Sequence, residues 1–191
     1  MSVILQQHIS RFIRIDPADF GSILSYFTPI NVPKKYNLLQ EGQICQHHYF
    51  VLNGCLRLFY ITEKGTEQTI DFAMENWWMA DYQSYATRQS AGFFIQSVLP
   101  SHLLALGYSA QEELLEKFPG MEKYFRLIHQ RAHAAAQYRM RIMQELSGEE
   151  LYRRFEEAYP AFVQRVPQYL LASFLGFTPE YLSEIRSRKR S

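Results

Sequence analysis

The chain has 191 residues, of which 47% are hydrophobic and 15% aromatic, and its formal net charge is only +1. This apolar content supports a packed core and argues against an intrinsically disordered chain. Because the overall charge is balanced, any contact with nucleic acid must come from a local basic patch. The length suffices for one domain of about 110–130 residues and a second, smaller one.

The sequence predicts a reduced, cytoplasmic protein. Cys45 and Cys55 are the only cysteines, and residues 1–16 contain no secretory cleavage signal. No apolar run approaches the roughly 18 residues that a membrane span needs. We therefore expect a cytoplasmic location and no membrane partner.

The first half of the chain is predicted to contain two helices followed by many short strands. Residues 3–13 are amphipathic, and Asp16-Pro17 is a typical N-cap and first-turn pair for a helix over residues 18–26. Short strands at regular spacing predict an antiparallel barrel or jelly roll. The predicted strands cover residues 28–32, 36–40, 48–52, 55–62, 68–73, 93–98 and 102–107.

Two turns in this region have the composition of hairpin connections. Asn53-Gly54 lies between two apolar runs, and both central residues of a type I′ turn need a positive φ. Lys64-Gly65 occupies a similar position further along the chain. We therefore expect a hairpin at each of these two turns.

After residue 108 the apolar period becomes helical. Ser109 and Glu112 have the spacing of a capping box, which predicts a short helix. A Pro-Gly pair at residues 119–120 then introduces a long helix over about residues 120–146. Apolar residues recur along it at alternating steps of four and three, the heptad spacing of a coiled-coil seam. The predicted seam consists of Met121, Phe125, Ile128, Ala132, Ala135, Ile142 and Leu146.

This long helix is expected to pair with a second copy of the chain. A single helix between two small domains has little else to cover its apolar face. Several alanines in residues 132–136 would allow a close approach of two helices. The alternative is that the same face packs against the β-domain of its own chain.

The last segment, residues 166–191, contains two short helical patterns around a glycine. Pro167 suits the first position of one helix and Gly176 its end, since glycine adopts the left-handed conformation without a Cβ clash. Thr178 and Pro179 suit the N-cap and first residue of the next helix. Two helices joined by a tight turn form the helix-turn-helix pattern, whose second helix can enter a DNA major groove. The alternative is an ordinary helical hairpin with a solvated basic end.

The predicted elements divide the chain into three parts. These are a β-roll with flanking helices over residues 1–118, a long dimerisation helix over residues 119–146, and a helical domain over residues 147–191. A second capping box, Ser147 with Glu150, opens the third part. The predicted fold class is α+β, with an antiparallel jelly roll followed by helices.

This order of elements resembles the Crp/Fnr family of bacterial transcription regulators along nearly the whole chain. The run from Glu41-Gly42 through YFVLNGCLRLFY to KGTEQTIDFA is similar to a cyclic-nucleotide-binding β-roll, with Gly54 at the sharp turn of the family. The tail VPQYLLASFLGFTPEYLSEIRSR is similar to the helix-turn-helix of the branch common in Bacteroidetes. The resemblance implies a homodimer that binds double-stranded DNA, with RNA polymerase as a further candidate partner.

The resemblance also implies an effector site, but one that departs from the family pattern. Nucleotide-binding members carry a Phe-x-Gly-Glu stretch before a short helix, and an Arg-Ser or Arg-Thr pair before the next strand. The arginine and backbone N–H groups neutralise the cyclic phosphate, and the carboxylate binds the ribose. Here Trp78-Met79-Ala80-Asp81 and Ala91-Gly92 stand in these places. The candidate pocket residues are Asp81, Tyr82, Arg88, Ala91 and Gly92.

Losing the phosphate-binding arginine should cost on the order of 2–5 kcal/mol of binding. Arg88 is the one cation nearby, three residues too early in the sequence. We therefore expect weak or no binding of cyclic AMP, and no cofactor. An unidentified, more apolar small molecule, or no effector at all, fits this stretch better.

Candidate DNA contacts lie on and around the second helix of the terminal pair. Glu180 can accept from a cytosine amino group, and Ser183 can contact a base or a phosphate. The family often carries an arginine at the position of Glu184, so this carboxylate removes a guanine contact and repels phosphate. Four cations and two carboxylates give residues 166–191 a net charge of +2. The candidates are Gln168, Thr178, Glu180, Tyr181, Ser183, Glu184, Arg186, Arg188, Lys189 and Arg190.

Two other functions fit parts of the sequence. A ligand-sensing β-roll could signal through protein contacts instead of DNA. A cupin-like metalloenzyme would need converging histidines, but His47 and His48 are adjacent and should point to opposite faces of a strand, leaving His102 alone. No Gly-x-Ser-x-Gly or phosphate-binding loop occurs, so we predict neither a metal site nor catalytic residues.

Overall fold

The computed structural model describes residues 2–188, and these residues form a mixed α+β fold. The strands are β1 (Phe27–Val32), β2 (Asn37–Leu39), β3 (His47–Asn53), β4 (Leu56–Ile61), β5 (Glu67–Ala73), β6 (Trp78–Met79), β7 (Phe94–Ser97) and β8 (Ser101–Gly107). The helices are α1 (Ser2–Ser10), α2 (Pro17–Leu24), α3 (Tyr82–Thr87), α4 (Tyr108–Lys117), α5 (Gly120–Glu145), α6 (Gly148–Ala158), α7 (Pro160–Arg165), α8 (Gln168–Leu175) and α9 (Pro179–Arg188).

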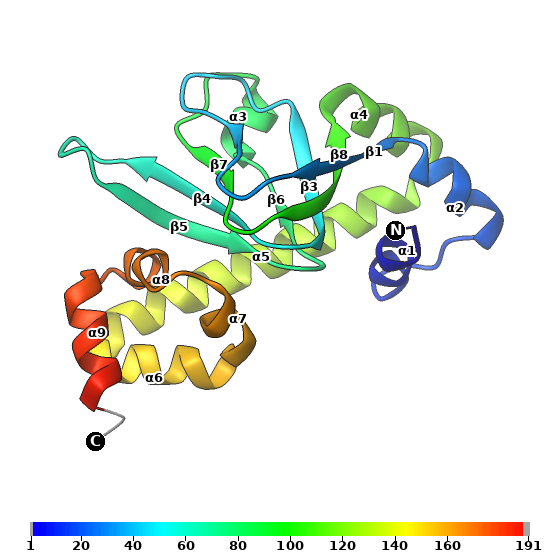
Figure 1. Cartoon of the computed structure of the whole chain (residues 1–191). Helices are drawn as coiled ribbons and strands as arrows, with labels where there is room; N and C mark the ends of the chain where they lie inside the picture. The colour runs from blue at the N-terminus through cyan, green and yellow to red at the C-terminus, as the bar shows by residue number, and fades with distance from the viewer. Residues whose placement is uncertain (1, 189–191) are drawn as a thin grey trace.

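The strands form a roll of two antiparallel sheets. One sheet has the order β1-β8-β3-β6 and the other the order β2-β7-β4-β5. Helix α5 runs beneath the roll (Figure 1). Helices α1, α2 and α4 lie near the N-terminal end of α5, and α6 to α9 lie around its C-terminal end. No helix within residues 2–188 is both long and apolar enough to span a lipid bilayer.

The seven predicted strands are all present, with ends that differ by at most one residue. The sequence missed β6, α3 and α7, because a two-residue strand and six-residue helices are too short to show a period. The long helix begins at Gly120, as predicted, and ends at Glu145.

One of the two predicted hairpins is wrong. Strands β3 and β4 belong to different sheets, so Asn53-Gly54 carries the chain from one sheet to the other. Gly54 has φ +112°, and a Cβ built there would lie 2.2 Å from Ser101 Oγ, so both backbone conformation and space require glycine. The Lys64-Gly65 hairpin is confirmed, since β4 and β5 pair antiparallel across it.

Two predicted helix starts need correction. Helix α4 starts at Tyr108, with Gly107 as a cap that makes no side-chain bond, so Ser109 does not form the expected capping box. The reason is that β8 continues to Gly107, and the next N–H donates to Gln46 O at 3.0 Å. Pro167 is the N-cap of α8 and not its first helical residue, because its ψ is 136°.

The capping box between α5 and α6 is confirmed. Ser147 Oγ accepts from the N–H of Glu150 at 3.4 Å, and the Glu150 carboxylate accepts from the N–H of Ser147 at 3.1 Å. Asp16 likewise caps α2, with Oδ1 accepting from the N–H of Ala18 at 2.9 Å. Short-range cap signals therefore located these helix starts correctly.

Most of the predicted dimer seam is buried inside the chain. Met121, Phe125 and Ile128 belong to a core that α5 shares with α1, α2, α4 and the β1-β8-β3-β6 sheet. Ile142 lies in the core of the C-terminal helices, and Leu146 packs against it. The alternative expectation, packing against the β-domain, is therefore correct for Met121, Phe125 and Ile128. Ile142 and Leu146 are covered instead by the C-terminal helices, which neither expectation included.

The middle of α5 has a different environment. Ala132 is half-buried and Ala135 exposed. Arg139, which interrupted the predicted seam, donates to Ile70 O in β5, and its guanidinium lies 4.5 Å from the ring centre of Phe174. The interruption marks the place where α5 passes between β5 and α8.

Candidate functional site

The α8–α9 pair has the local geometry of two helices joined by a tight turn. Gly176 ends α8 at φ 77°, in the left-handed conformation that only glycine adopts readily. The N–H of Phe177 returns to Ala172 O at 2.8 Å. Thr178 Oγ1 then accepts from the N–H of Tyr181 at 3.2 Å, which caps α9. The predicted turn and cap are confirmed.

The two faces of α9 differ in burial. Leu182 and Ile185 are 0% and 5% exposed and lie in the core formed by α6, α7, α8 and the end of α5. The opposite face is polar and exposed. A shallow surface hollow runs along it, lined by Gln168, Pro179, Glu180, Ser183, Glu184 and Ser187.

Tyr181 lies apart from this hollow. Its ring is 5.4 Å from that of Phe177, and a Cβ built on Gly148 would approach its hydroxyl to 2.7 Å. The side chain thus packs on the start of α6, and we expect it to support α9 rather than reach DNA.

The charged candidates on α9 are partly paired with one another. Arg188 forms an i,i+4 ion pair with Glu184, so this carboxylate is neutralised instead of facing solvent alone. Arg186 donates to Gln168 Oε1 at 3.3 Å, which joins the two helices. The candidates Lys189 and Arg190 lie outside the described residues.

Helices α7 and α8 are held against the roll by polar contacts around a small apolar cluster. Ser173 Oγ accepts from the N–H of Thr69 in β5 at 2.8 Å. Arg165 donates to both carboxylate oxygens of Glu75, at 2.7 and 2.9 Å. The buried residues between them are Cys55, Val98, Val166 and Leu170.

In the expected effector region, Asp81 is committed to the backbone. The residue is 2% exposed and is the N-cap of α3. Its Oδ1 accepts from the N–H of Ser84 at 3.0 Å, and its Oδ2 from the N–H of Gly92 at 3.2 Å. The carboxylate therefore already has a partner on each oxygen and serves as a helix cap.

Arg88 is also engaged by the protein. It ends α3 with φ 58°, and its guanidinium donates to Cys45 O at 2.8 Å and to the Gln46 side chain. The group lies 4.5 Å from the ring centre of Tyr108. Ala91 is 3% exposed and places only a methyl group in the core of the roll.

The fifth pocket candidate, Tyr82, lies against α5 instead. Its hydroxyl is 3.2 Å from His48 Nε2, and its ring is 5.1 Å from that of His129. His48 is fully buried, and burial, with a further contribution from His129, lowers its pKa to about 3 in spite of an opposing hydrogen bond from Gln111. The structure thus brings Asp81, Ala91 and Gly92 together and separates Tyr82 and Arg88 from them.

The histidines considered for a metal site do not converge. His47 is exposed while His48 is 1% exposed, as expected for neighbours on opposite faces of a strand. His102 contacts Asn31 on the surface. Within residues 2–188, no group of three or more His, Cys, Asp or Glu side chains is arranged to hold a metal ion.

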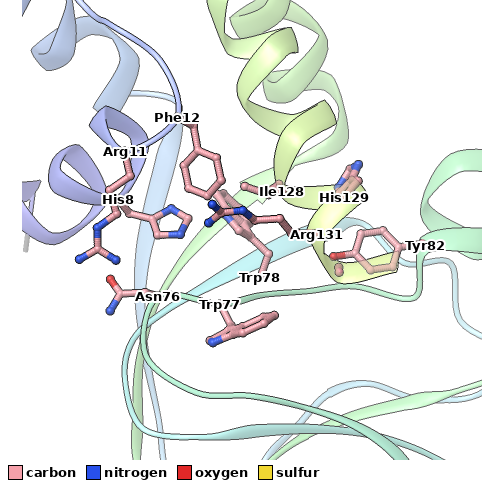
Figure 2. A pocket seen from close by; sticks show the side chains of 11 residues that line it. His8, Arg11, Phe12, Asn76, Trp77, Trp78, Tyr82, Ile128, His129 and Arg131 are labelled. Carbon is pink, nitrogen blue, oxygen red and sulfur yellow. The ribbon is translucent and has the colours of Figure 1, made fainter. Parts of the chain in front are cut away.

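Sequence reasoning missed two hollows on the surface of the protein. One is a cleft of about 570 Å³ beside β1, β2 and the start of β3, whose lining includes Ile44, Cys45 and Tyr49. The other lies between α1, β6 and α5 (Figure 2). The cleft is lined only by residues 30–49. The second hollow draws on residues between 8 and 132, so no local spacing signals it.

The roll is similar to a known class of domain. Residues 29–118 match the family model described as the cyclic nucleotide-binding domain. This stretch runs from within β1 through β8 and includes α3, so it supports the sequence resemblance for the β-domain. No curated protein sequence is significantly similar to the chain.

Solved structures with the same fold include several transcription regulators. The catabolite activator protein of Thermus thermophilus is 20% identical, with 93% of this chain and 84% of that one covered and a TM-score of 0.58. The c-di-GMP-responsive global regulator CLP of Xanthomonas campestris is 10% identical, with 92% of each chain covered and a TM-score of 0.75. FixK2 of Bradyrhizobium japonicum is 14% identical, with 85% of this chain and 83% of that one covered and a TM-score of 0.73. At these identities the likeness shows the fold: the structural neighbours are Crp/Fnr-type regulators.

Proposed function

We propose that the protein is a homodimeric, DNA-binding transcription regulator of the Crp/Fnr type whose roll does not respond to cyclic AMP. The observation that carries this proposal is the α8–α9 pair, in which Gly176 and Thr178 fix a tight turn and α9 presents an exposed polar face. A short helix held in this way can enter a major groove, with its first residues against base edges. The whole-chain likeness to regulators supports the same function.

In this proposal the exposed side chains at the start of α9 make the base contacts. Ser183 and Glu180 line the surface hollow, and Glu180 forms no ion pair within residues 2–188. Gln168 lies at the start of α8, where side chains usually contact the DNA backbone. Because Arg188 is paired with Glu184, its charge is partly withheld from phosphate.

Dimerisation would use the part of α5 that its own chain leaves open. Residues His129, His133, Ala136, Met140 and Met143 are exposed and follow one another at steps of four and three. This stripe lies beside the buried seam and keeps the heptad period, which suits a second copy of the same helix. A two-fold axis along it would place two α9 helices on one side of the dimer, as a pseudo-palindromic operator with half-sites about 34 Å apart requires.

The lack of a cyclic AMP response follows from the contacts in the roll. A cyclic phosphate needs a cation where Ala91 offers a methyl group, and Arg88 would have to leave Cys45 O and Gln46 to supply one. The ribose would have to displace the backbone N–H groups that occupy both oxygens of Asp81. Each change leaves a buried polar group without its partner.

A gel shift on DNA from upstream of the gene, over a salt series, tests the proposal. We expect a specific complex that weakens as salt rises. Glu184→Ala should tighten binding severalfold, because it removes a carboxylate near phosphate and releases Arg188, whereas Glu157→Ala in the exposed part of α6 should change little. Cyclic AMP should leave the midpoint unchanged.

The outcomes separate the two parts of the proposal. The absence of specific binding at every salt concentration would contradict the DNA-binding function. A clear shift of the midpoint with micromolar cyclic AMP would contradict only the account of the roll.

A further inference from the structure

The hollow between α1, β6 and α5 collects aromatic rings and cations from distant parts of the chain. It has a volume of about 190 Å³. Figure 2 shows its side chains, which come from α1, from the segment Asn76 to Trp78, and from α5. The buried side chains His8, Trp78 and Ile128, which are 7 to 8% exposed, form its inner part. Phe12 and the half-exposed Trp77 add flat apolar surface.

The charge of this hollow is entirely positive. Arg11 and Arg131 line it, and none of its eleven lining residues is an aspartate or glutamate. Within residues 2–188 neither arginine has a carboxylate within ion-pair distance. Arg131 lies 4.7 Å from the ring centre of Phe12, which holds its guanidinium over the hollow (Figure 2).

The two arginines act on the same point of the hollow. Burial lowers the pKa of His8 most, and the positive charges of Arg11 and Arg131 lower it further, to about 4. Burial also lowers the pKa of His129. Because His8 is neutral at pH 7, the charge that a ligand would meet comes from the two guanidinium groups. Two like charges that converge without a counter-charge repel each other, and an anion between them removes that repulsion.

We propose that this hollow is a binding site for a small ligand that joins a flat apolar ring to an anionic group, such as an aromatic carboxylate or a phosphate monoester. The ring would lie against Trp77 and Trp78, and the anion would accept hydrogen bonds from Arg11 and Arg131. The Asn76 side chain, which also lines the hollow, supplies a further donor. The volume holds one ring with one charged group, and a dinucleotide is too large for it.

The site shares only Tyr82 with the expected effector region of the roll and does not depend on DNA binding. Asp81, Arg88 and Ala91 are not among its lining residues. A ligand there would contact α1, β6 and α5 together, and so would hold the long helix in one position against the roll. Binding of a ligand to this hollow can be measured on the full chain without any DNA.

Tryptophan fluorescence gives a direct test, because the only two tryptophans of the chain, Trp77 and Trp78, both line the hollow. The probes are benzoate, phenyl phosphate, inorganic phosphate and the uncharged benzyl alcohol, with excitation above the absorption of the probes. We expect saturable changes with benzoate and phenyl phosphate, and binding of benzyl alcohol and inorganic phosphate at least about tenfold weaker.

Matched arginine variants establish where the probes bind. Arg131→Gln and Arg11→Gln should each weaken benzoate binding by about tenfold or more. Arg126→Gln on α5 and Arg14→Gln after α1 remove the same charge outside the hollow and should change the affinity less than about twofold. Because all four side chains are exposed, the variants should fold, and circular dichroism checks this.

Three outcomes would overturn the proposal. Benzyl alcohol could bind as tightly as benzoate, which would mean that the cations make no contribution. The two control variants could weaken binding as much as the two hollow variants, which would mean that only general charge matters. Finally, no anion could alter the fluorescence up to about 10 mM, which would mean that the hollow binds none of this class.

Discussion

The two ends of α5 make contacts of different kinds with the rest of the chain. At the N-terminal end, Tyr124 is fully buried among aromatic rings, and its hydroxyl accepts from Trp78 Nε1 at 2.8 Å. The same hydroxyl is 2.8 Å from His8 Nδ1. Since the indole can only donate, the hydroxyl proton is available for the histidine, and all three groups are satisfied. This end is an apolar core with a closed polar network inside it.

The C-terminal end meets the roll through a smaller and more polar contact. Only a cluster of Cys55, Val98, Val166 and Leu170 is buried between the roll and helices α7 and α8. Hydrogen bonds and the Arg165–Glu75 ion pair surround it. Water can replace polar contacts at little cost, so this contact is the weaker of the two. The comparison suggests one permanent unit, the roll with the first half of α5, and one separable unit, the C-terminal helices.

The largest expected effect uses two methionines on the same helix. Met121 is 1% exposed in the core, and Met140 is 62% exposed on the open stripe. Met121→Ala should lower the free energy of unfolding by about 2–5 kcal/mol, because it leaves a cavity. Met140→Ala should change it by less than about 0.5 kcal/mol in the monomer. Urea denaturation at low protein concentration measures both values, and equal losses would contradict the assignment of these faces.

The same stripe offers a sharper test of self-association. Met140→Glu places a charge where a second copy of α5 would pack, so sedimentation should show a shift toward the monomer. Met121→Ala should not produce that shift at a temperature where the variant remains folded. If Met140→Glu leaves the association unchanged, the exposed stripe of α5 is not the dimer contact.

The sequence predicted the elements of this fold better than their partners. The heptad pattern correctly gave a long amphipathic helix, but Met121 and Ile142 look alike in sequence whether they meet a second chain or their own. What decides between these cases is the path of the roll and of the C-terminal helices, which depends on long-range contacts. Local signals such as Gly176 and Ser147 were correct because caps and turns are determined by neighbouring residues.

The candidate sites followed the same rule. The terminal helix pair could be placed because its turn chemistry is local. In the roll, the sequence could show that Ala91 lacks a guanidinium, but not that both oxygens of Asp81 are already bonded. The hollow at Trp77 draws on residues from 8 to 132, and no spacing in the sequence joins them.

The next prediction concerns the stability of the protein in acid, which should depend on the unit that contains His8 and His48. His8 has an unfolded pKa of 6.5 that falls to about 4 in the fold through burial and the nearby Arg11 and Arg131. The unfolded state therefore binds more protons below pH 6.5, so stability falls as the pH drops from 6.5 toward 4. His48, with a folded pKa of about 3, acts in the same direction. Each histidine contributes up to about 1.4 kcal/mol per pH unit in this window.

Urea denaturation at pH 7.5, 6.5 and 5.5 measures this loss, and His8→Asn should reduce its slope. His133→Asn changes an exposed histidine of the open stripe and serves as the control. Glu75 acts in the same direction as the histidines but at lower pH. Burial raises its pKa, but the hydrogen bonds from Arg165 and Gly54 outweigh burial and lower it below 4.5, so its contribution is lost only in stronger acid. A stability that is flat between pH 7.5 and 5.5 would contradict the burial of neutral His8.

The smallest expected effect is at the separable contact. The Arg165–Glu75 pair is bidentate, but its side chains are 36% and 27% exposed, so Arg165→Gln should cost at most about 1 kcal/mol of global stability. Arg141→Gln, which breaks the exposed pair with Glu145, is the matched control and should cost less. Hydrogen exchange should nevertheless increase in α7 and α8 for the first variant alone, while the roll keeps its protection. A loss of several kcal/mol, or faster exchange in the roll itself, would mean that the two units form one cooperative core. With exchange confined to α7 and α8, the contact around Arg165 becomes the place where the helices that would face DNA can move independently of the roll.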